Sequence, residues 1–422
     1  MNAPDTKPTG RGPLMSADDA LARLLAAVAP SGRTETVPTP EAWGRMLASD
    51  IVSSVDVPPE DNSAMDGYAL RVADLASGAG SVLPVSQRIV AGRPGLPLQP
   101  GTAARIFTGA QVPAGADAVV MQEHCEAIAG EGLGSVRISE LPAPGTAIRR
   151  QGEDVRRGHV VLRAGHRMDA AAIGLAATVG MATLEVAARP RVALFSTGDE
   201  LVMPGEPLPP GAIYNSNRFM LGALLRGQGC VVTDLGNVPD QLEATRAMLR
   251  EAATGHDLIL SSGGVSVGEE DHLRPALAAE GRLDLWAIAI KPGKPLAFGA
   301  VRQPAGKGAQ TWFIGLPGNP VSSHVTFTLF VRPVLARLQG AEAAWPIGMP
   351  MRADFAWPRP DKRREFLRVR RNASGGLDLY ANQGSGVLNS LAWGDGLADL
   401  APGQAVQPGD MVRFLSLAEL AP

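Results

Sequence analysis

Glycines, serines and carboxylates meet in one stretch near the middle of the chain. Residues 261–271 read SSGGVSVGEED and follow the apolar run LIL at 258–260, a pattern typical of a buried strand that ends in a glycine turn. The glycines would let backbone N–H groups approach a phosphate closely, and the serines would add hydroxyl donors. The acids would repel a bare phosphate, so they favour a site in which a divalent cation lies between them and the anion. An ordinary glycine turn before a helix with an acidic first turn fits this stretch equally well.

Two other stretches add charge. Residues 196–201 (STGDEL) bring Glu200 beside a glycine turn, and residues 289–299 (AIKPGKPLAFG) carry Lys291 and Lys294 on a turn stiffened by proline. Two ammonium groups placed in this way can hold a phosphate or another oxyanion. A solvated loop is the usual explanation for a single lysine pair, but this pair follows a buried strand, which favours a site.

A further stretch, GLPGNPVSS at residues 315–323, follows an apolar run and precedes a helix expected from about residue 321 to residue 338. Backbone N–H groups at the head of a helix bind anions. The candidate substrate-binding residues of this stretch and of residues 261–271 are Ser262, Gly263, Gly264, Ser266, Gly268, Pro317, Gly318 and Asn319.

The densest basic cluster lies at residues 362–371, which read KRREFLRVRR. Its arginines fit either the solvated face of a strand or a patch that recognises a phosphate or a polyanion. The cluster is too short to indicate nucleic-acid binding, and no aromatic stacking surface accompanies it.

A sheet is needed to position these stretches. From residue 190 to residue 339, apolar runs alternate with helical segments, which predicts βαβ units and a mostly parallel sheet. Ligands of such sheets bind at the carboxyl ends of the strands. The stretches at 196–201, 261–271 and 289–299 are therefore expected to converge at one edge of the sheet.

The rest of the chain predicts a multidomain α/β plus β protein. Residues 1–52 and 147–188 would form a discontinuous N-terminal domain, with helices beginning at Ser16 and at Thr39 and with Trp43 on a buried face. Residues 53–146 consist of short apolar runs between turn residues, which predicts an inserted β domain. An α/β domain would occupy residues 189–340, and a small β domain or barrel residues 341–422.

Composition narrows the classes of function. The 422 residues carry a net charge of −3, which provides no field for nucleic acid or an anionic membrane. Two cysteines, Cys125 and Cys230, indicate buried thiols in a reducing compartment. With no signal segment and no apolar run of membrane-spanning length, we expect a cytoplasmic protein without a membrane partner.

Eight motifs in order closely resemble the molybdopterin molybdenumtransferase family, which includes MoeA and the E domains of gephyrin and of the plant Cnx proteins. They are SAMDGYA (63–69), IFTGA (106–110), RRQGEDV (149–155), STGDEL (196–201), YNSN (214–217), SSGGVSVGEED (261–271), AIKPGKPLAFG (289–299) and GLPGNPVSS (315–323). The resemblance extends from the first expected helix to the terminal β domain.

This resemblance implies an elongated N-terminal domain, an inserted β domain, a molybdopterin-binding α/β domain and a C-terminal β-barrel. It implies a homodimer whose active site lies between the α/β domain of one chain and the N-terminal domains of the other. The implied substrates are adenylylated molybdopterin and molybdate, with Mg²⁺ as cofactor, and the products are AMP and the molybdenum cofactor. The molybdopterin adenylyltransferase and recipient molybdoenzymes would be further partners.

The resemblance also assigns site residues. The implied catalytic residues are Asp66, Thr108, Asp154, Glu200, Asp271, Lys291 and Lys294, of which Glu200 and Asp271 would bind the metal. Arg363 and Ser385 match the family's pocket for the molybdenum oxyanion more loosely. Asp240 stands where the family often has an acid, although the preceding Val238-Pro239 departs from the family's arginine-containing pattern.

Two alternatives use the same α/β domain or the same family. A molybdopterin adenylyltransferase or a nucleotide pyrophosphatase would share the α/β domain, but would lack SAMDGYA and the terminal β region in this order. A non-enzymatic scaffold that clusters receptors, as gephyrin does, would need linker and partner domains that this sequence does not contain.

Overall fold

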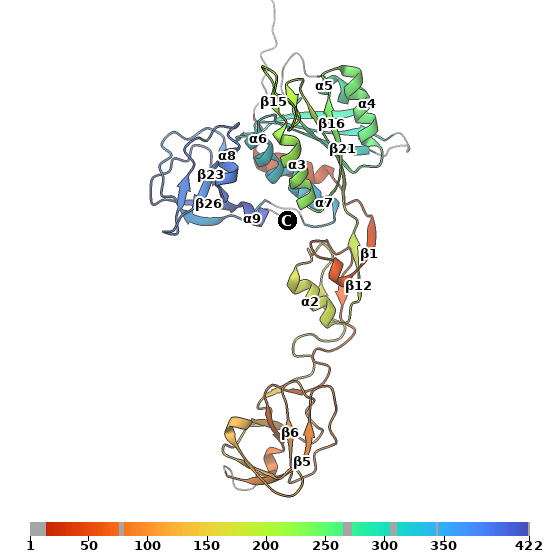
Figure 1. Ribbon diagram of the computed structural model, residues 1–422, viewed down its shortest axis with the longest axis vertical. Helices are drawn as coiled ribbons and strands as arrows, with labels where there is room; N and C mark the ends of the chain where they lie inside the picture. Colours follow the sequence, from red (N-terminus) through yellow and green to blue (C-terminus); the bar gives the residue numbers. More distant parts are fainter. Residues whose placement is uncertain (1–13, 76–79, 265–271, 304–309, 343–344, 421–422) are drawn as a thin grey trace, which may run out of the picture. The chain divides into compact units, whose positions relative to one another are not determined.

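The computed structural model describes residues 14–75, 80–264, 272–303, 310–342 and 345–420. The chain divides into two compact units (Figure 1). Unit 1 comprises Met1–Glu35, Gly44–Ala48 and Glu185–Pro422, and unit 2 comprises Thr36–Trp43 and Ser49–Leu184. Ser266, Gly268 and Asp271 of the predicted site lie outside the described residues.

A six-stranded sheet forms the centre of unit 1. Its order is β16 (Val231–Val238), β13 (Arg191–Thr197), β17 (Leu258–Ser262), β21 (Gln310–Leu316), β20 (Pro295–Arg302) and β18 (Gly281–Ala287). The first four strands are parallel to one another, as the alternation of strands and helices predicted.

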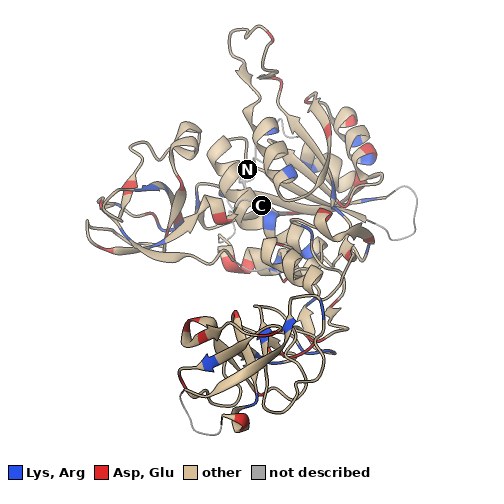
Figure 2. Cartoon of the chain, turned by 60° about the horizontal axis from the view of Figure 1, so that its bottom comes forward, with Lys and Arg blue, Asp and Glu red and all other residues tan. Residues whose placement is uncertain are grey.

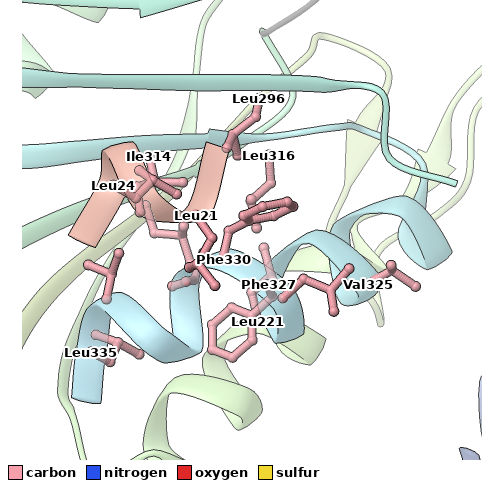
Figure 3. Packing of buried hydrophobic residues seen from close by; sticks show 14 of the residues in the cluster. Leu21, Leu24, Leu221, Leu296, Ile314, Leu316, Val325, Phe327, Phe330 and Leu335 are labelled. Atoms are coloured by element: carbon pink, nitrogen blue, oxygen red, sulfur yellow. The ribbon is translucent and has the colours of Figure 1, made fainter. Parts of the chain in front are cut away.

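Helices cover both faces of this sheet. One face packs against α1 (Ala17–Ala27), α3 (Ser216–Gly227) and the helical run α6 (Pro320–Thr326), η4 (Phe327–Val331) and α7 (Arg332–Leu338), and Figure 3 shows this core. The other face packs against α4 (Leu242–Ala253) and α5 (Leu273–Glu280). Successive residues of β13 enter opposite cores, Leu194 on the first face and Phe195 on the second. Burial on both faces explains the continuous apolar runs of the sequence.

The connection from β18 to β20 differs from the predicted βαβ pattern. β18 and β20 are antiparallel neighbours, and only residues 288–294 join them, which is too short for a helical crossover. β20 is also antiparallel to β21, so β18 runs in the same direction as β21. The loop after β18, with Lys291 and Lys294, therefore still lies at the edge where β13, β17 and β21 end.

The expected second helix was wrong. Thr39–Glu41 forms only a single 3-10 turn, η1, and the Trp43 side chain is 63% exposed. Gly44 has a φ of 70°, a left-handed conformation that ends a helix. The first helix was predicted correctly, because the Ser16 hydroxyl caps α1 by accepting from the Asp19 N–H at 3.0 Å.

The C-terminal part of unit 1 contains a second sheet. It runs in the order β19 (Ile290–Lys291), β23 (Arg364–Arg371), β25 (Gly396–Leu400), β26 (Met411–Ser416) and β22 (Met349–Arg352), and β24 (Leu377–Leu379) pairs with β23. The helices α8 (Asn389–Trp393) and α9 (Leu417–Leu420) accompany it. β19 belongs to the loop that follows β18, and its pairing places Lys291 opposite Glu365. The closure of this sheet into a barrel stays a prediction.

Unit 2 is rich in short strands. Its main sheet has the order β7 (Ala118–Met121), β4 (Gly67–Leu70), β6 (Ala103–Ile106), β5 (Val82–Ile89), β9 (Ser135–Ile138) and β8 (Cys125–Ile128). Smaller elements are β2 (Ile51–Val52), β3 (Asn62–Ser63), β10 (Ile148–Arg149), β11 (Val160–Leu162), α2 (Ala170–Thr178) and the 3-10 turns η2 (Val72–Asp74) and η3 (Gln122–His124). Two further pairs do not belong to unit 2 alone. β1 (Thr34–Pro38) pairs with β12 (Thr183–Ala187), and each of these strands has residues in both units, whereas β14 (Leu201–Val202) and β15 (Ile213–Tyr214) pair within unit 1.

Residues of both charge signs occur in most parts of the chain. Figure 2 shows Lys and Arg interspersed with Asp and Glu along the ribbon. Within the described residues, every helix is too short or too polar to cross a membrane.

Candidate functional site

A cavity of about 860 Å³ lies in unit 1 at the carboxyl edge of the parallel strands. Loops that follow β13, β16, β17, β18 and β21 line it, and two segments of the C-terminal part complete the lining. The lining residues are Thr197, Gly198, Glu200, Leu201, Ile213, Asn217, Asp240, Ser262, Gly263, Gly264, Lys291, Pro292, Gly293, Lys294, Pro295, Pro317, Gly318, Asn319, Ser322, Arg363, Gln383, Gly384 and Ser385.

The cavity brings together most of the predicted site residues of unit 1. Glu200, Lys291 and Lys294 line it, as do Ser262, Gly263, Gly264, Pro317, Gly318, Asn319, Arg363 and Ser385. Asp240, whose role the sequence left open, also lines it. Residues separated by more than one hundred positions in the sequence therefore share one space.

The glycine turn after β17 is required by close backbone packing. A Cβ atom at Gly263 would lie 2.8 Å from the Thr197 carbonyl oxygen, and the φ of Gly263 is 91°. The Gly263 N–H donates to the Leu316 carbonyl at 3.1 Å. This donor joins the ends of β17 and β21, so it differs from the anion-binding N–H that the sequence suggested.

Asn217, in the first turn of α3, was not singled out from the sequence. Its Nδ2 donates to the Ser262 Oγ at 2.8 Å and to the Gly318 carbonyl at 2.6 Å. Its Oδ1 is buried and has no hydrogen-bond partner within the described chain. Asn217 thus ties together the loops after β17 and β21. The YNSN motif was a signal for it, but the motif alone did not show these partners.

The basic wall of the cavity, which we define as Lys291, Lys294 and Arg363, is built on two carboxylates. Lys291 Nζ lies 3.0 Å from a Glu365 oxygen and 3.5 Å from Asp361 Oδ2. Arg363 donates from Nε and Nη2 to the two oxygens of Asp361, both at 2.9 Å. Lys294 forms no ion pair with any described carboxylate, which leaves it free for an anionic ligand.

The two carboxylates that contact the basic wall, Asp361 and Glu365, are each fixed by their surroundings. Hydrogen bonds from Arg363 hold the pKa of Asp361 well below its usual range and raise the pKa of Arg363. The Glu365 side chain is only 1% exposed. One of its oxygens accepts from Trp357 Nε1 at 2.9 Å and from the Asp361 N–H at 2.8 Å. The wall is therefore pre-organised before any ligand binds.

The acidic wall, which we define as Glu200 and Asp240, has a different character. Neither carboxylate forms an ion pair with a described Lys, Arg or His side chain. Glu200 folds back over Gly198, where an added Cβ atom would clash with its carboxylate at 2.4 Å. The Asp240 N–H donates to Asp199 Oδ1 at 3.3 Å.

Oxygen donors of this kind suit Mg²⁺, which prefers carboxylates and water. The described residues contain no group of three or more His, Cys, Asp or Glu side chains arranged to hold a metal ion. The second predicted metal ligand, Asp271, lies outside the described residues. Metal binding by Glu200 and Asp271 therefore stays a prediction, and Asp240, whose role the sequence left open, is a further oxygen donor in the lining of the cavity.

The predicted residues of the N-terminal part lie in unit 2. Asp66 Oδ1 accepts from the Thr108 N–H at 2.8 Å and from the Thr108 hydroxyl at 2.7 Å. These hydrogen bonds lower the pKa of Asp66, so it is ionised at neutral pH. Asp154 is exposed, and its N–H donates to the Val57 carbonyl at 3.0 Å.

The basic cluster at 362–371 is only partly a solvated strand face. Arg370 and Arg371 are exposed at the end of β23, and Arg364 is bound by both oxygens of Asp399 at 2.7 Å. Arg368 is only 1% exposed. The cluster thus contributes one residue, Arg363, to the lining of the cavity.

Three segments of the chain match known family regions. Residues 15–180 match the MoeA N-terminal region (domain I and II), residues 193–337 a probable molybdopterin binding domain, and residues 350–417 the MoeA C-terminal region (domain IV).

Whole-chain comparisons agree with these matches. The chain is 43% identical to the molybdopterin molybdenumtransferase of Haemophilus influenzae over 328 residues, which cover 78% of each chain. It is 38% identical to molybdopterin molybdenumtransferase 2 of Mycobacterium tuberculosis, over 94% of this chain and 96% of that one. The crystal structure of a molybdopterin biosynthesis MoeA protein from Pyrococcus horikoshii OT3 superposes with a TM-score of 0.81 at 29% identity, over 96% of this chain and all of that one. This chain therefore belongs to the molybdopterin molybdenumtransferase (MoeA) family.

Proposed function

We propose that this protein inserts molybdate into adenylylated molybdopterin, releasing AMP and the molybdenum cofactor. The observation that carries the proposal is one cavity whose lining combines a pre-organised basic wall with Glu200 and Asp240, which form no ion pair within the described part of the chain. Both substrates of the proposed reaction are anions: a pterin nucleotide that carries a pyrophosphate, and a tetrahedral dianion. Family membership supports the same reaction.

The basic wall would bind the anions. Lys294 has no ion pair with a described carboxylate, so its ammonium group is available to a phosphate or an oxyanion. Arg363 and Ser385 come from the C-terminal part and line the same cavity. We assign Arg363 and Ser385 to the binding of molybdate.

The acidic wall would hold Mg²⁺. Glu200 and Asp240 provide oxygen ligands, and Asp271 is the third candidate. When bound, Mg²⁺ would neutralise the charge of the phosphoanhydride oxygens. The protein itself would contribute the ammonium groups of Lys291 and Lys294, which would lie beside the same negative charge of the phosphoanhydride.

A shared active site and a wider set of partners belong to the same proposal. We infer a homodimer in which Asp66, Thr108 and Asp154 of one chain complete the cavity of the other. We also propose that the protein has the four-domain arrangement with a C-terminal β-barrel and that it is cytoplasmic. The molybdopterin adenylyltransferase and the recipient molybdoenzymes would supply the substrate and take the product.

One assay separates this function from its rivals. Purified protein, Mg²⁺ and adenylylated molybdopterin are incubated with and without molybdate, and AMP is measured. We expect AMP only when molybdate is present. AMP release without molybdate would favour a pyrophosphatase, and no release under either condition would favour a scaffold.

The shared site has a separate test. Asp66→Ala and Lys291→Ala chains, each inactive alone, are mixed, and the heterodimers are verified by mass spectrometry. We expect partial recovery of AMP release, because one of the two sites would keep both residues. No recovery in verified heterodimers would place the complete site within one chain.

A further inference from the structure

Arg368 is a buried cation without a carboxylate partner. It lies in β23 and is 1% exposed, and no described Asp or Glu forms an ion pair with it. Its guanidinium donates only to neutral oxygens: from Nε to the Ser390 Oγ at 3.1 Å, from Nη1 to the Phe366 carbonyl at 3.2 Å, and from Nη2 to the Gly384 carbonyl at 3.2 Å. Burial lowers its pKa to about 10, so it remains charged at neutral pH. Burying such a charge is unfavourable unless another group compensates it.

Arg364, on the same strand, differs from Arg368 because it has a carboxylate partner. Arg364 is also largely buried, but Asp399 binds it through two hydrogen bonds of 2.7 Å. Its charge is neutralised within the protein. The charge of Arg368 has no such partner among the described residues, although each of its three side-chain nitrogens donates one hydrogen bond.

Arg368 holds the segment of chain that separates it from the cavity. Gln383, Gly384 and Ser385 line the cavity. The Gln383 side chain accepts from the Arg368 N–H at 2.9 Å and donates to the Arg368 carbonyl at 3.0 Å. On the other side, the Ser385 carbonyl accepts from the Val321 N–H at the head of α6, at 3.0 Å. The segment is thus fixed on both sides.

The hydrogen bond from Arg368 to the Gly384 carbonyl also fixes the direction of the Ser385 N–H, because both groups belong to one peptide bond. In a planar trans peptide the C=O and N–H groups point in opposite directions. Because the Gly384 carbonyl points to Arg368, the Ser385 N–H points away from it. That N–H has no acceptor within the described chain.

We propose that Arg368 is a positioning residue for the oxyanion subsite: it turns the Gly384–Ser385 peptide so that the Ser385 N–H donates to a tetrahedral dianion in the cavity. The bound dianion supplies the counter-charge that no described carboxylate provides to Arg368. The subsite thereby selects for a doubly charged oxyanion at the end of the cavity that Arg363 and Ser385 line. This inference rests on the proposed function, because molybdate is the dianion in question.

The test is the affinity of the full-length protein for molybdate, measured by calorimetry with Na₂MoO₄. We expect Arg368→Met to weaken binding roughly ten- to a hundredfold, the change expected when hydrogen bonding that involves a charged group is lost. Arg368→Lys, which keeps the charge, should recover part of the loss. The matched control Arg370→Met, on the exposed end of the same strand, should bind as the wild type does.

Two further measurements distinguish positioning from general support. The melting temperature of unliganded Arg368→Met should fall modestly, because the variant removes the hydrogen bonds to Ser390, Phe366 and Gly384 while it also removes a buried charge that has no described carboxylate partner. In turnover, the KM for molybdate should rise while the KM for adenylylated molybdopterin stays unchanged. A general collapse of the cavity wall would raise both.

Each outcome is decisive. A folded Arg368→Met protein with wild-type molybdate affinity overturns the inference. If that variant does not fold, Arg368→Gln, which keeps a donor without the charge, is judged by the same affinity criterion. A wild-type protein that does not bind molybdate overturns the proposed function, whereas tight wild-type binding with no change in the variant overturns only the role of Arg368.

Discussion

The two walls of the cavity are prepared for ligands in opposite ways. In the basic wall, Lys291 and Arg363 are held by Asp361 and Glu365 before any ligand binds. In the acidic wall, Glu200 and Asp240 form no ion pair with a described cation. A rigid cationic surface suits an anion of fixed shape, because little ordering cost remains at binding. Unpaired carboxylates suit a cation that brings its own hydration and geometry. We therefore expect substitutions in the two walls to affect activity and the free energy of unfolding to different extents.

The largest expected effect is on the acidic wall. Glu200→Gln should reduce molybdate-dependent AMP release by about a hundredfold or more, the order of loss seen when one group that stabilises transition-state charge is removed. Since Glu200 is exposed and has no ion pair with a described cation, the melting temperature should not change. AMP release is measured by chromatography at several Mg²⁺ concentrations. Wild-type turnover at low Mg²⁺ would contradict a role for Glu200 in binding the metal.

The second comparison is within the basic wall. Lys291→Ala and Lys294→Ala should both reduce activity, but only Lys291→Ala should lower the free energy of unfolding, by roughly 1–3 kcal/mol. The reason is that Lys291 is the ion-pair partner of the buried Glu365, which would keep its hydrogen bonds from Trp357 and Asp361 but lose its counter-charge. Urea unfolding measures the difference. Equal stability of the two variants would show that the wall is not built on this pair.

A third, smaller effect concerns the strand ends that carry both walls. Asn217→Ala removes the hydrogen bonds to Ser262 and Gly318 and should cost about 1–2 kcal/mol of unfolding free energy. The same urea experiment measures it. Asn217→Ser, which keeps a shorter hydroxyl donor, serves as the control and should lose less. A loss of activity without any loss of stability would instead indicate that the unpartnered Oδ1 contacts the ligand.

The smallest effect is a pH dependence of the basic wall. Hydrogen bonds from Arg363 lower the pKa of Asp361 from its usual 3.8. A group with a lowered folded pKa contributes stability above its unfolded pKa, and loses it as the pH falls through the folded pKa. In Arg363→Met the pKa of Asp361 should rise toward its ordinary value. The stability difference between wild type and variant should therefore narrow as the pH falls below about 4. Urea unfolding at pH 7, 5 and 3.5 measures it, and a constant difference would contradict the pairing.

The edge of the sheet was predictable from the sequence, because the signal is local. Each apolar run, such as residues 258–260, is short, is followed by a glycine turn and recurs between helical segments. Parallel strands bring their carboxyl ends to one edge, so the convergence of Glu200 and Lys291 followed without knowing the strand order. The lysine loop reached this edge by an antiparallel hairpin, which the sequence pattern did not distinguish from a helical crossover.

The partners of the basic wall were not predictable, because they depend on pairing between distant strands. Lys291 and Glu365 are opposite one another only through the register of β19 and β23. Likewise, no local pattern separates the buried Arg368 from the exposed Arg370, since both fit the alternation of one strand. The exposure of Trp43 was missed for a simpler reason. Gly44 ends the helical turn, although the spacing of the apolar residues on either side of it is typical of a helix.

The two-residue strand β19 has a consequence for how the chain can be divided. It lies in the loop between β18 and β20, yet its hydrogen bonds belong to β23 of the C-terminal sheet. A protein truncated near residue 340 would keep the α/β sheet, but would leave β19 as an open edge available to other chains. It would also remove the carboxylates that hold Lys291. The region that matches a probable molybdopterin binding domain therefore depends on the C-terminal sheet for the orientation of this lysine.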